Sequence, residues 1–221
     1  MYGTVLFDLD GTLTDPGIGI TNSVMYALKK YGIEPSDRSE LYKFIGPPLT
    51  ESFERFYGFT PGQAKEAVEF YREYFKDKGI FENRPYKGID VLLSSLKNAG
   101  MILAVATSKP EVFAERILEH FDLAQYFTVT AGSNLDGSRI SKADVINYAL
   151  ETLKVNDKTS VLMVGDREHD VIGAKAAGID CVGVLYGYGS REELESAGAG
   201  SIAQTVEELQ NMLLYTVTTV S

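Results

Sequence analysis

The segment Thr4-Val5-Leu6-Phe7-Asp8-Leu9-Asp10-Gly11-Thr12-Leu13 (residues 4–13) decides the fold of this chain. Four strand-favouring residues come first and two carboxylates follow at once, which predicts a buried strand with acids at its carboxyl end. Side chains alternate along a strand, so Asp8 and Asp10 share one side if the strand continues that far. Open α/β sheets bind their ligands at this end of the strands. Gly11 permits a tight turn and close approach to an anion, although a solvated acidic turn would also explain the two acids.

Beyond about residue 83, the apolar pattern alternates between strands and helices. Near-continuous apolar strands that are separated by amphipathic helices are typical of a parallel sheet covered on both faces. Because crossover connections are right-handed, the pattern predicts a doubly wound, Rossmann-like α/β core. The expected strands span residues 4–7, 101–106, 126–130, 160–164 and 179–184, and the expected helices span residues 88–98, 110–120, 141–153, 168–177 and 205–214.

Residues 15–82 interrupt this alternation with a helix-rich stretch that contains no convincing strand. The clearest helix is expected at residues 61–78, where apolar side chains recur at helical spacing and charged side chains occupy the other side. The stretch is too long for a loop between a strand and a helix, so we expect an inserted helical domain of residues 15–82. The α/β core would then comprise residues 1–14 and 83–221, and the two crossings would permit a hinged lid.

Asp166 and Asp170 form a second acidic pair after the expected strand at residues 160–164. They are four residues apart, so they share one face of the helix that begins there. Acidic side chains also suit helix N-termini on electrostatic grounds alone, which is the alternative explanation. If both acidic pairs meet at the carboxyl edge of the sheet, their carboxylates would repel one another unless a divalent cation neutralised them. Mg²⁺ prefers oxygen ligands, so the sequence predicts a magnesium site.

Residues that suit anion binding follow two other strands. Thr107 and Ser108 follow the expected strand at residues 101–106. A hydroxyl and backbone N–H groups just before a helix form a binding site for an anion. An N-cap role explains Ser108 equally well. Lys142 lies in the first turn of an expected helix, where a cation is electrostatically disfavoured, so its position suggests a ligand, with a solvated surface lysine as the alternative. Lys109 and Arg139 are the other cations that could bind the anion in place of Lys142.

The composition limits the classes of partner. The chain has 31 acidic and 21 basic residues and a formal net charge of −10, which disfavours nonspecific binding to nucleic acid or anionic lipid. No apolar stretch approaches the ~20 residues of a membrane span and no basic leader is present, so we expect neither a membrane segment nor a signal peptide. Cys181 is the single cysteine, which fits a reducing cytoplasm. The sequence leaves the oligomeric state open between a monomer and a homodimer.

Along the chain, the motifs occur in the order Asp-x-Asp, Thr-Ser, Lys and Gly-Asp-x-x-x-Asp. Their combination resembles the haloacid dehalogenase-like hydrolase superfamily, and the resemblance covers essentially the whole chain. The helical insert after the first motif is similar to the first cap type of that superfamily. The nearest branch is the phosphoglycolate phosphatase-like one. Within it, residues 44–49 (Phe-Ile-Gly-Pro-Pro-Leu) and 165–170 (Gly-Asp-Arg-Glu-His-Asp) look like 5′-nucleotidase-like members.

The resemblance implies a phosphatase mechanism. Asp8 would attack phosphorus and become an aspartyl-phosphate, and Asp10 would protonate the leaving oxygen and then deprotonate the attacking water. Dehalogenases of the superfamily lack an acid at the position of Asp10, since halide departs without a proton, so Asp10 indicates phosphate chemistry. The implied Mg²⁺ ligands are Asp8, the Asp10 backbone carbonyl, Asp166 and, directly or through water, Asp170. The implied phosphate ligands are Thr107, Lys142 and backbone N–H groups near Leu9, Asp10 and Ser108.

Substrate specificity is expected in the helical insert. A rigid Gly46-Pro47-Pro48 loop would reach over the site, and packing or surface exposure within the insert is the alternative explanation for each candidate there. The aromatic loop at residues 186–189 (Tyr-Gly-Tyr-Gly) would border the entrance. The candidate substrate residues are Asn22, Phe44, Gly46, Pro47 and Arg55.

We therefore expect a Mg²⁺-dependent phosphatase that acts on a small phosphorylated metabolite, such as a nucleoside 5′-monophosphate or 2-phosphoglycolate. The alternatives are a hexose-phosphate mutase of the same superfamily and a non-catalytic phospho-accepting or phosphate-sensing domain. A mutase would need basic groups in the cap that orient a bisphosphate, and no decisive set stands out there. A bare phospho-accepting domain needs no insert of residues 15–82, and Asp10 favours turnover over storage of the phosphoryl group.

Overall fold

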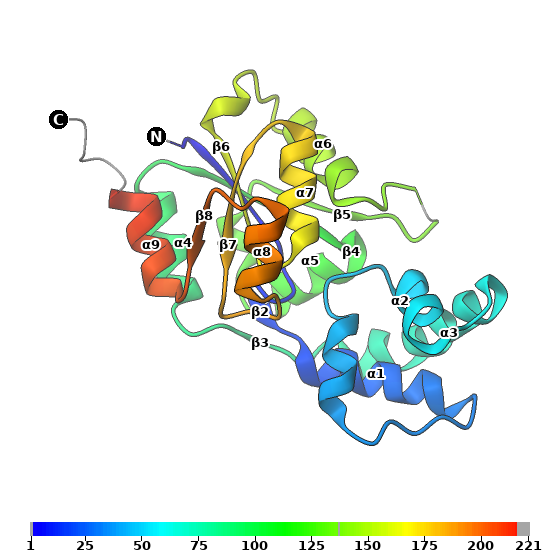
Figure 1. Cartoon of the computed structure of the whole chain (residues 1–221). Helices are drawn as coiled ribbons and strands as arrows, with labels where there is room; N and C mark the ends of the chain where they lie inside the picture. Colours follow the sequence, from blue (N-terminus) through cyan, green and yellow to red (C-terminus); the bar gives the residue numbers. More distant parts are fainter. Residues whose placement is uncertain (1, 137, 216–221) are drawn as a thin grey trace. The chain divides into compact units, whose positions relative to one another are not determined.

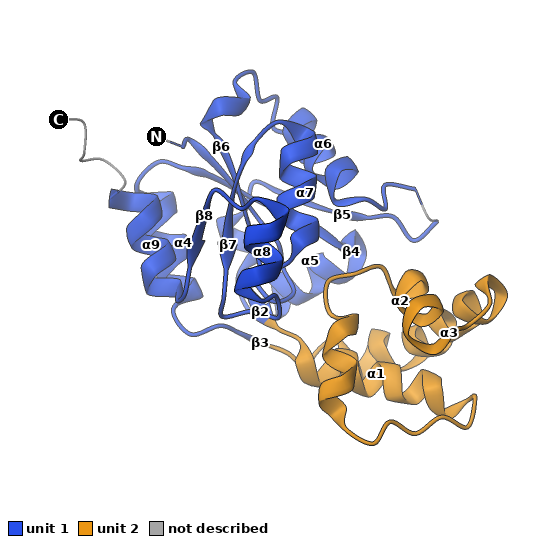
Figure 2. Ribbon diagram, in the orientation of Figure 1, with its two compact units in different colours: residues 1–14, 85–221 blue, residues 15–84 orange. Residues whose placement is uncertain are grey.

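The computed structural model describes residues 2–136 and 138–215 and divides into two compact units. Unit 1 comprises Met1–Thr14 and Pro85–Ser221, and unit 2 comprises Asp15–Arg84 (Figure 2). The expected insert of residues 15–82 ends two residues before unit 2 does. Arg84 Nη2 lies 2.9 Å from Asp15 Oδ2, so an ion pair joins the first and last residues of unit 2.

Unit 1 is built on a six-stranded parallel sheet. Its strands are β1 (Thr4–Phe7), β4 (Ile102–Pro110), β5 (Val129–Ser133), β6 (Val161–Gly165), β7 (Asp180–Val184) and β8 (Ser201–Ala203). The strand order is β5-β4-β1-β6-β7-β8, and each neighbouring pair is parallel. The fully buried β1 pairs on both sides, with Thr4 opposite Ile102 and Val161. The expected α/β class is confirmed.

Helices cover both faces of this sheet (Figure 1). They are α4 (Ile89–Asn98), α5 (Glu111–His120), α6 (Lys142–Thr152), α7 (Glu168–Ala177), α8 (Arg191–Ala197) and α9 (Val206–Tyr215). On one face, Leu6, Ala104 and Met163 share an apolar cluster with side chains of α6, α7 and α8. Because side chains alternate along a strand, Val5 and Leu103 point to the opposite face, which α4, α5 and α9 cover.

Part of unit 1 departs from the sequence-based prediction. Strand β5 begins at Val129 rather than at residue 126, because Tyr126, which was expected to open it, is the last residue of the short 3₁₀ helix η3 (Ala124–Tyr126). Neither α8 nor β8 was expected. Helix α8 has seven residues, three of them glutamate, and β8 has three residues, so neither is long enough to show an apolar period.

Unit 2 is helical, and its first and last residues belong to a short two-stranded ribbon formed by β2 (Thr14–Asp15) and β3 (Arg84–Pro85). Thr60 and Gln63 form a capping box at the start of its longest helix, with Pro61 in the first turn. The helix expected at residues 61–78 is therefore present, and it ends in a π-helical turn. The helices are α1 (Gly17–Lys29), η1 (Arg38–Phe44), α2 (Leu49–Tyr57), α3 (Pro61–Tyr74) and η2 (Phe75–Gly79).

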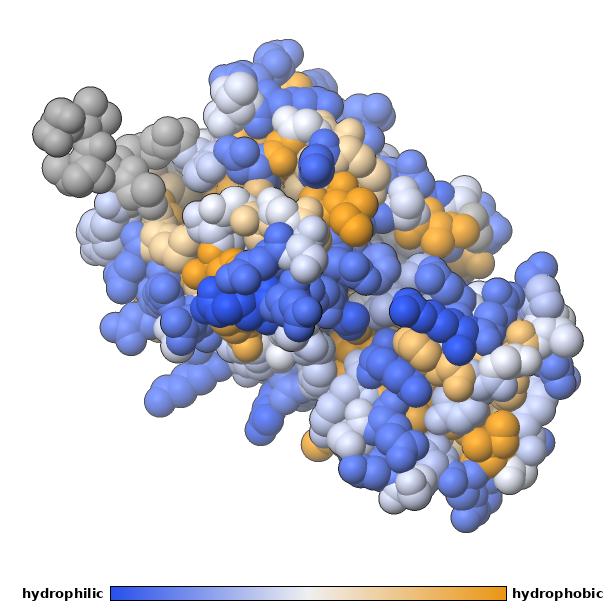
Figure 3. Space-filling model, viewed as in Figure 1, coloured by the Kyte–Doolittle hydropathy of each residue, from blue (hydrophilic) through white to orange (hydrophobic). Residues whose placement is uncertain are grey.

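The surface of the chain is mostly hydrophilic on the face that Figure 3 shows, with apolar side chains scattered among polar ones. Large exposed apolar residues occur singly on several helices, for example Val91 on α4 and Ile172 on α7. Such isolated side chains are common in folded proteins and do not mark a binding site. No helix within residues 2–136 and 138–215 is long and apolar enough to cross a membrane.

Candidate active site

The carboxyl end of β1 leads the first acidic pair into a tight turn. The Asp8 N–H donates to the Val164 carbonyl at 2.9 Å, so Asp8 still takes part in the hydrogen bonding of the sheet. Gly11 follows in the left-handed region with φ of 84°, where other residues are strained. A Cβ atom at Gly11 would lie 2.2 Å from Asp166 Oδ2. Only glycine therefore lets this turn pass so close to the carboxylate of the second acidic pair.

Three carboxylates converge at this edge of the sheet. Asp8, Asp166 and Asp170 each offer an oxygen, and these oxygens lie within 4.8 Å of one another. All three residues are buried, Asp166 and Asp170 completely. Asp166 directly follows β6 and Asp170 lies in the first turn of α7, so the four-residue spacing brings both to the end of β1.

Lys142 joins two of these carboxylates. Its Nζ lies 2.9 Å from Asp8 Oδ1 and 2.8 Å from Asp170 Oδ1, and it donates to the Ala106 carbonyl at 3.1 Å. Burial lowers the pKa of Lys142, but the attraction of Asp170 and Asp8 outweighs burial and raises this pKa above its usual value. Lys142 is therefore a buried cation, and the surface-lysine alternative is wrong.

Asp10 has a cation of its own. Lys109 forms a buried ion pair with Asp10 Oδ2, whereas Asp10 Oδ1 is buried and has no hydrogen-bond partner among the described residues. Burial raises the pKa of the Asp10 carboxyl, Lys109 opposes that shift and the negative charge of Asp8 adds to it. Asp10 thus combines a raised pKa with an oxygen that is free to exchange a proton, as a general acid requires.

The donor set fits a hard divalent cation. Four buried carboxylates face the buried ammonium groups of Lys109 and Lys142, so the fully ionised site carries a formal charge of −2 (four negative, two positive). These four carboxylates, here called the acidic cluster, belong to Asp8, Asp10, Asp166 and Asp170. Burial, followed by repulsion from Asp170 and Asp8, raises the pKa of Asp166 well above its usual value. A divalent cation among oxygen ligands would neutralise this excess, and Mg²⁺ is such a cation.

The other residues predicted for the core site all belong to unit 1. Thr107 is buried at the end of the regular part of β4, and its Oγ1 accepts the Lys109 N–H at 3.3 Å. Ser108 is half-buried, and its carbonyl accepts the Ser133 hydroxyl at 2.8 Å. The Leu9 side chain is fully buried in the core. Of the two substitutes for Lys142, Lys109 reaches the acidic cluster, whereas Arg139 pairs with Glu111 at 2.6 Å.

The five candidate substrate residues belong to unit 2. Asn22 donates to Glu82 at 2.8 Å, and Phe44 is 1% exposed within an aromatic cluster that includes Phe53. Phe44 therefore stabilises the helices and offers almost no surface to a substrate. Arg55 is exposed, with its guanidinium 5.6 Å from the Phe56 ring. The half-buried Gly46 and Pro47 form the loop between η1 and α2.

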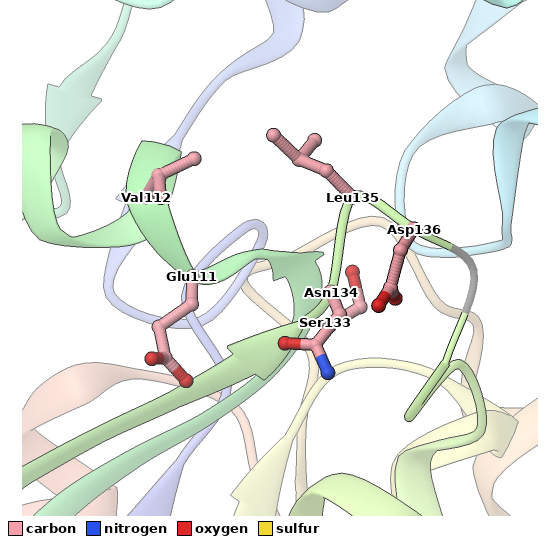
Figure 4. Close-up of a pocket in the computed structure, with 6 residues that line it drawn as sticks. All are labelled: Glu111, Val112, Ser133, Asn134, Leu135 and Asp136. Carbon is pink, nitrogen blue, oxygen red and sulfur yellow. The ribbon is translucent and has the colours of Figure 1, made fainter.

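A separate cavity of about 380 Å³ lies where β5 ends and α5 begins (Figure 4). The side chains of Val112 and Leu135 point toward one another across it, with Glu111 on the α5 side. None of the acidic cluster lines this cavity. The remaining lining residues are Ser133, Asn134 and Asp136.

Sequence reasoning missed the groups that hold Asp166 in place. Asp166 Oδ2 accepts the backbone N–H of Tyr188 at 2.8 Å, and Asp166 Oδ1 lies 3.4 Å from the Thr12 hydroxyl. Because almost every residue type carries a backbone N–H, the residue type at position 188 does not indicate that its N–H is the donor. The available signal was the Gly-x-Gly spacing at residues 187–189, because paired glycines after a strand indicate close backbone approach.

Asp166→Asn is expected to stabilise the metal-free protein and to abolish its stabilisation by Mg²⁺. The carboxylate of Asp166 is fully buried and its folded pKa is raised, so its contribution to stability is lost as pH rises through that pKa. An amide keeps an acceptor for Tyr188 and removes the charge. At pH 7 we expect the metal-free Tm to rise by about 2–4 °C, the shift that ~1 kcal/mol gives in a chain of this size.

Thermal denaturation with EDTA and with Mg²⁺ measures both effects, since a cation that binds only the folded state raises Tm. Asp90→Asn, at an exposed position in the first turn of α4, is the matched control: it removes a charge that favours the helix N-terminus, so it should not raise the metal-free Tm and should leave the response to Mg²⁺ unchanged. A lower metal-free Tm for Asp166→Asn, or an unchanged response to Mg²⁺, would contradict the interpretation of the acidic cluster.

Comparison with known proteins agrees with this geometry. A curated 5′-nucleotidase from Pseudomonas aeruginosa is 48% identical over 195 residues, with 88% of each chain covered. The tyrosine-protein kinase PtkA from Mycobacterium tuberculosis is 43% identical over 211 residues, covering 95% of this chain and 72% of PtkA. The crystal structure of a predicted phosphatase from Clostridium acetobutylicum has a TM-score of 0.94 at 53% identity, covering 97% of this chain and 99% of that one.

The family assignment follows from the match that spans most of the chain. Residues 5–184 match the family model of the haloacid dehalogenase-like hydrolases, and this range contains every residue of the acidic cluster. Together with the α/β sheet, the buried carboxylates and the similarity to these proteins, this match shows that the chain belongs to the haloacid dehalogenase-like hydrolase family.

Proposed function

We propose that this protein is a Mg²⁺-dependent phosphatase that hydrolyses a small phosphomonoester through an aspartyl-phosphate on Asp8. The observation that carries the proposal is the convergence of Asp8, Asp166 and Asp170 at the end of β1, with Asp10 only two residues from Asp8. The similarity to a curated 5′-nucleotidase and to a predicted phosphatase supports the same reaction class.

In the first half-reaction, a carboxylate oxygen of Asp8 attacks phosphorus and the bond to the leaving oxygen breaks. Asp10 delivers its proton to that oxygen, so the product leaves as an alcohol. In the second half-reaction, Asp10 takes a proton from water, the water oxygen attacks phosphorus and the bond to Asp8 breaks. One difficult hydrolysis is thereby divided into two easier transfers.

The remaining buried groups bind charge during both steps. Lys142, which lies between Asp8 and Asp170, would attract the phosphoryl oxygens, together with the Thr107 hydroxyl and the backbone near Ser108. When bound, Mg²⁺ would offset the negative charge between nucleophile and phosphate. The residues that would hold it are Asp8, the Asp10 carbonyl, Asp166 and Asp170.

For the substrate, we favour a nucleoside 5′-monophosphate over 2-phosphoglycolate. The motifs at residues 44–49 and 165–170 resemble 5′-nucleotidase-like members, and the curated 5′-nucleotidase is 48% identical. Unit 2 would be the cap that selects the substrate, through the loop at residues 46–48 and through Asn22 and Arg55. Phe44 would act there only by packing, since it is buried.

A second candidate is phosphoryl transfer to a protein tyrosine. The similarity to PtkA, which is named a tyrosine-protein kinase, is the observation that favours it. Asp8 would accept a phosphoryl group from a donor such as a nucleoside triphosphate, and a tyrosine oxygen would then replace water in the second half-reaction. The two candidates share the first step and differ in the acceptor.

Phosphate release from a panel of phosphomonoesters, with Mg²⁺ and with excess EDTA, tests the proposal. We expect release that requires Mg²⁺ and is fastest with nucleoside 5′-monophosphates. Preference for 2-phosphoglycolate would move the substrate assignment to that compound. A parallel incubation with a nucleoside triphosphate and tyrosine peptides separates the second candidate, which requires phosphotyrosine to appear. Activity that resists EDTA, or no release from any ester, would contradict the proposed phosphatase.

A further inference from the structure

The segment that follows β7 packs against the acidic cluster. Residues 186–197, here called the β7–α8 segment, comprise the loop after β7 and helix α8, which lies beside α7 (Figure 1). The Tyr188 N–H of this segment donates to Asp166 Oδ2 at 2.8 Å. The Tyr188 hydrogen bond therefore uses one of the two carboxylate oxygens. The other oxygen, Oδ1, lies 3.4 Å from the Thr12 hydroxyl and is the less constrained of the two.

Two glycines let the segment approach Asp166 this closely. A Cβ atom at Gly189 would lie 1.8 Å from the Asp166 carbonyl oxygen, and one at Gly187 would lie 2.3 Å from the Gly11 carbonyl oxygen and 2.5 Å from Asp166 Cβ. Neither glycine has a positive φ of the kind that other residues avoid. Space, and not backbone conformation, is therefore what requires glycine at both positions.

A second attachment lies one turn further on, in α8. One oxygen of Glu193, Oε1, accepts Arg167 Nε at 2.8 Å and the Glu168 N–H at 2.9 Å. Ser190 caps α8 by accepting the Glu193 N–H at 3.1 Å, which fixes the start of that helix. Through these two hydrogen bonds, Glu193 anchors the two residues that directly follow Asp166 in the chain.

We propose that the β7–α8 segment is a positioning element for the metal ion, with Gly189 and Glu193 as its positioning residues. It fixes the carboxylate of Asp166 from one side through Tyr188 and fixes the backbone after Asp166 through Glu193. This inference rests on the proposed function, in which Asp166 ligates Mg²⁺. Groups that orient a metal ligand typically contribute 10–100-fold to metal affinity.

Gly189→Ala tests the inference most directly. The added Cβ collides with a backbone oxygen, which cannot rotate away, so the loop must move and the Tyr188 N–H must leave Asp166. We expect the Mg²⁺ dissociation constant, measured by titration calorimetry on the full chain, to rise by about 10–100-fold. Gly200→Ala is the matched control, because its Cβ would meet only the Cys181 carbonyl oxygen at an ordinary 3.4 Å.

Glu193 gives a second test that adds no atoms to the site. Glu193→Ala removes the acceptor for Arg167 and Glu168 and should also weaken Mg²⁺ binding, whereas Glu193→Gln keeps an acceptor oxygen and should restore most of the affinity. The activity should show a matching pattern: a higher half-saturating Mg²⁺ concentration, with kcat and the KM for substrate recovered at saturating Mg²⁺. A general folding defect would instead lower kcat at every Mg²⁺ concentration.

The possible failures are distinguishable. If the wild-type protein binds no Mg²⁺, the proposed metal dependence is wrong and the inference is wrong with it. If the wild-type protein binds Mg²⁺ and both Gly189→Ala and Glu193→Ala bind it with unchanged affinity, the β7–α8 segment does not position the metal, while the proposed function stands. Should Gly189→Ala not fold, Glu193→Ala and Glu193→Gln decide alone.

Discussion

Asp8→Asn is expected to lower kcat by at least ~10³-fold on every phosphomonoester, because an amide cannot form the phosphoryl bond. The fold should persist. Asparagine has the shape of aspartate, and Lys142 keeps Asp170 at 2.8 Å and the Ala106 carbonyl at 3.1 Å as partners. Steady-state kinetics and a thermal denaturation curve measure the two effects separately.

The matched control for Asp8→Asn is Asp90→Asn, the same chemical change at an exposed position of α4. Its kcat should equal that of the wild-type protein, since it touches no group of the acidic cluster. A folded Asp8→Asn protein with more than a few per cent of wild-type activity would contradict the assignment of Asp8 as the nucleophile.

Asp10→Asn has the second largest expected effect and should depend on the leaving group. Without the acid, an alkoxide must depart unprotonated, and we expect the first half-reaction on a nucleoside 5′-monophosphate to slow by about 10²–10⁴-fold. Nitrophenolate needs no proton to leave, so the first half-reaction on p-nitrophenyl phosphate should change little. The second half-reaction, which needs Asp10 as a base, should slow for both esters.

Rapid-quench kinetics distinguish these steps. Asp10→Asn should release about one equivalent of nitrophenol per enzyme in a burst and then turn over slowly. Lys109→Met is an informative companion, because it removes the ion pair of Asp10 and keeps the carboxyl group. Equal slowing of the first half-reaction on both esters by Asp10→Asn would contradict a role for Asp10 as the acid.

The sequence allowed prediction of those parts of the fold that follow from apolar periodicity. Strand β1 and the alternation after residue 88 are long or strongly apolar, and their order matches the structure, although β4 runs to Pro110, four residues beyond its expected end at residue 106. The expected start of β5 is too early: Tyr126 and Phe127 are residues that favour strands, yet Tyr126 ends a 3₁₀ turn and β5 begins only at Val129. The short α8 and β8 depend on tertiary contacts, such as the fully buried Leu194, and not on a local pattern.

In the candidate site, the sequence located the side chains but not their pairing. Asp8, Asp166 and Asp170 were expected to meet because the carboxyl ends of parallel strands share one edge of the sheet. The pairing of Lys109 with Asp10 and of Lys142 with two carboxylates depends on side-chain direction in three dimensions. The identity of Tyr188 does not indicate its N–H as the donor, because every residue except proline carries one, and only the glycines at positions 187 and 189 indicate a close backbone approach there.

The central claim is that Asp8 carries the phosphoryl group, and trapping that group tests it most directly. Asp10→Asn should accumulate the aspartyl-phosphate, since its second half-reaction is slow. After incubation with p-nitrophenyl phosphate and Mg²⁺, acid quenching and peptide mass spectrometry should place one phosphoryl group on Asp8. The Asp8→Asn, Asp10→Asn double variant should carry none. A burst without a phosphorylated peptide, or a phosphoryl group on any residue other than Asp8, would contradict the account.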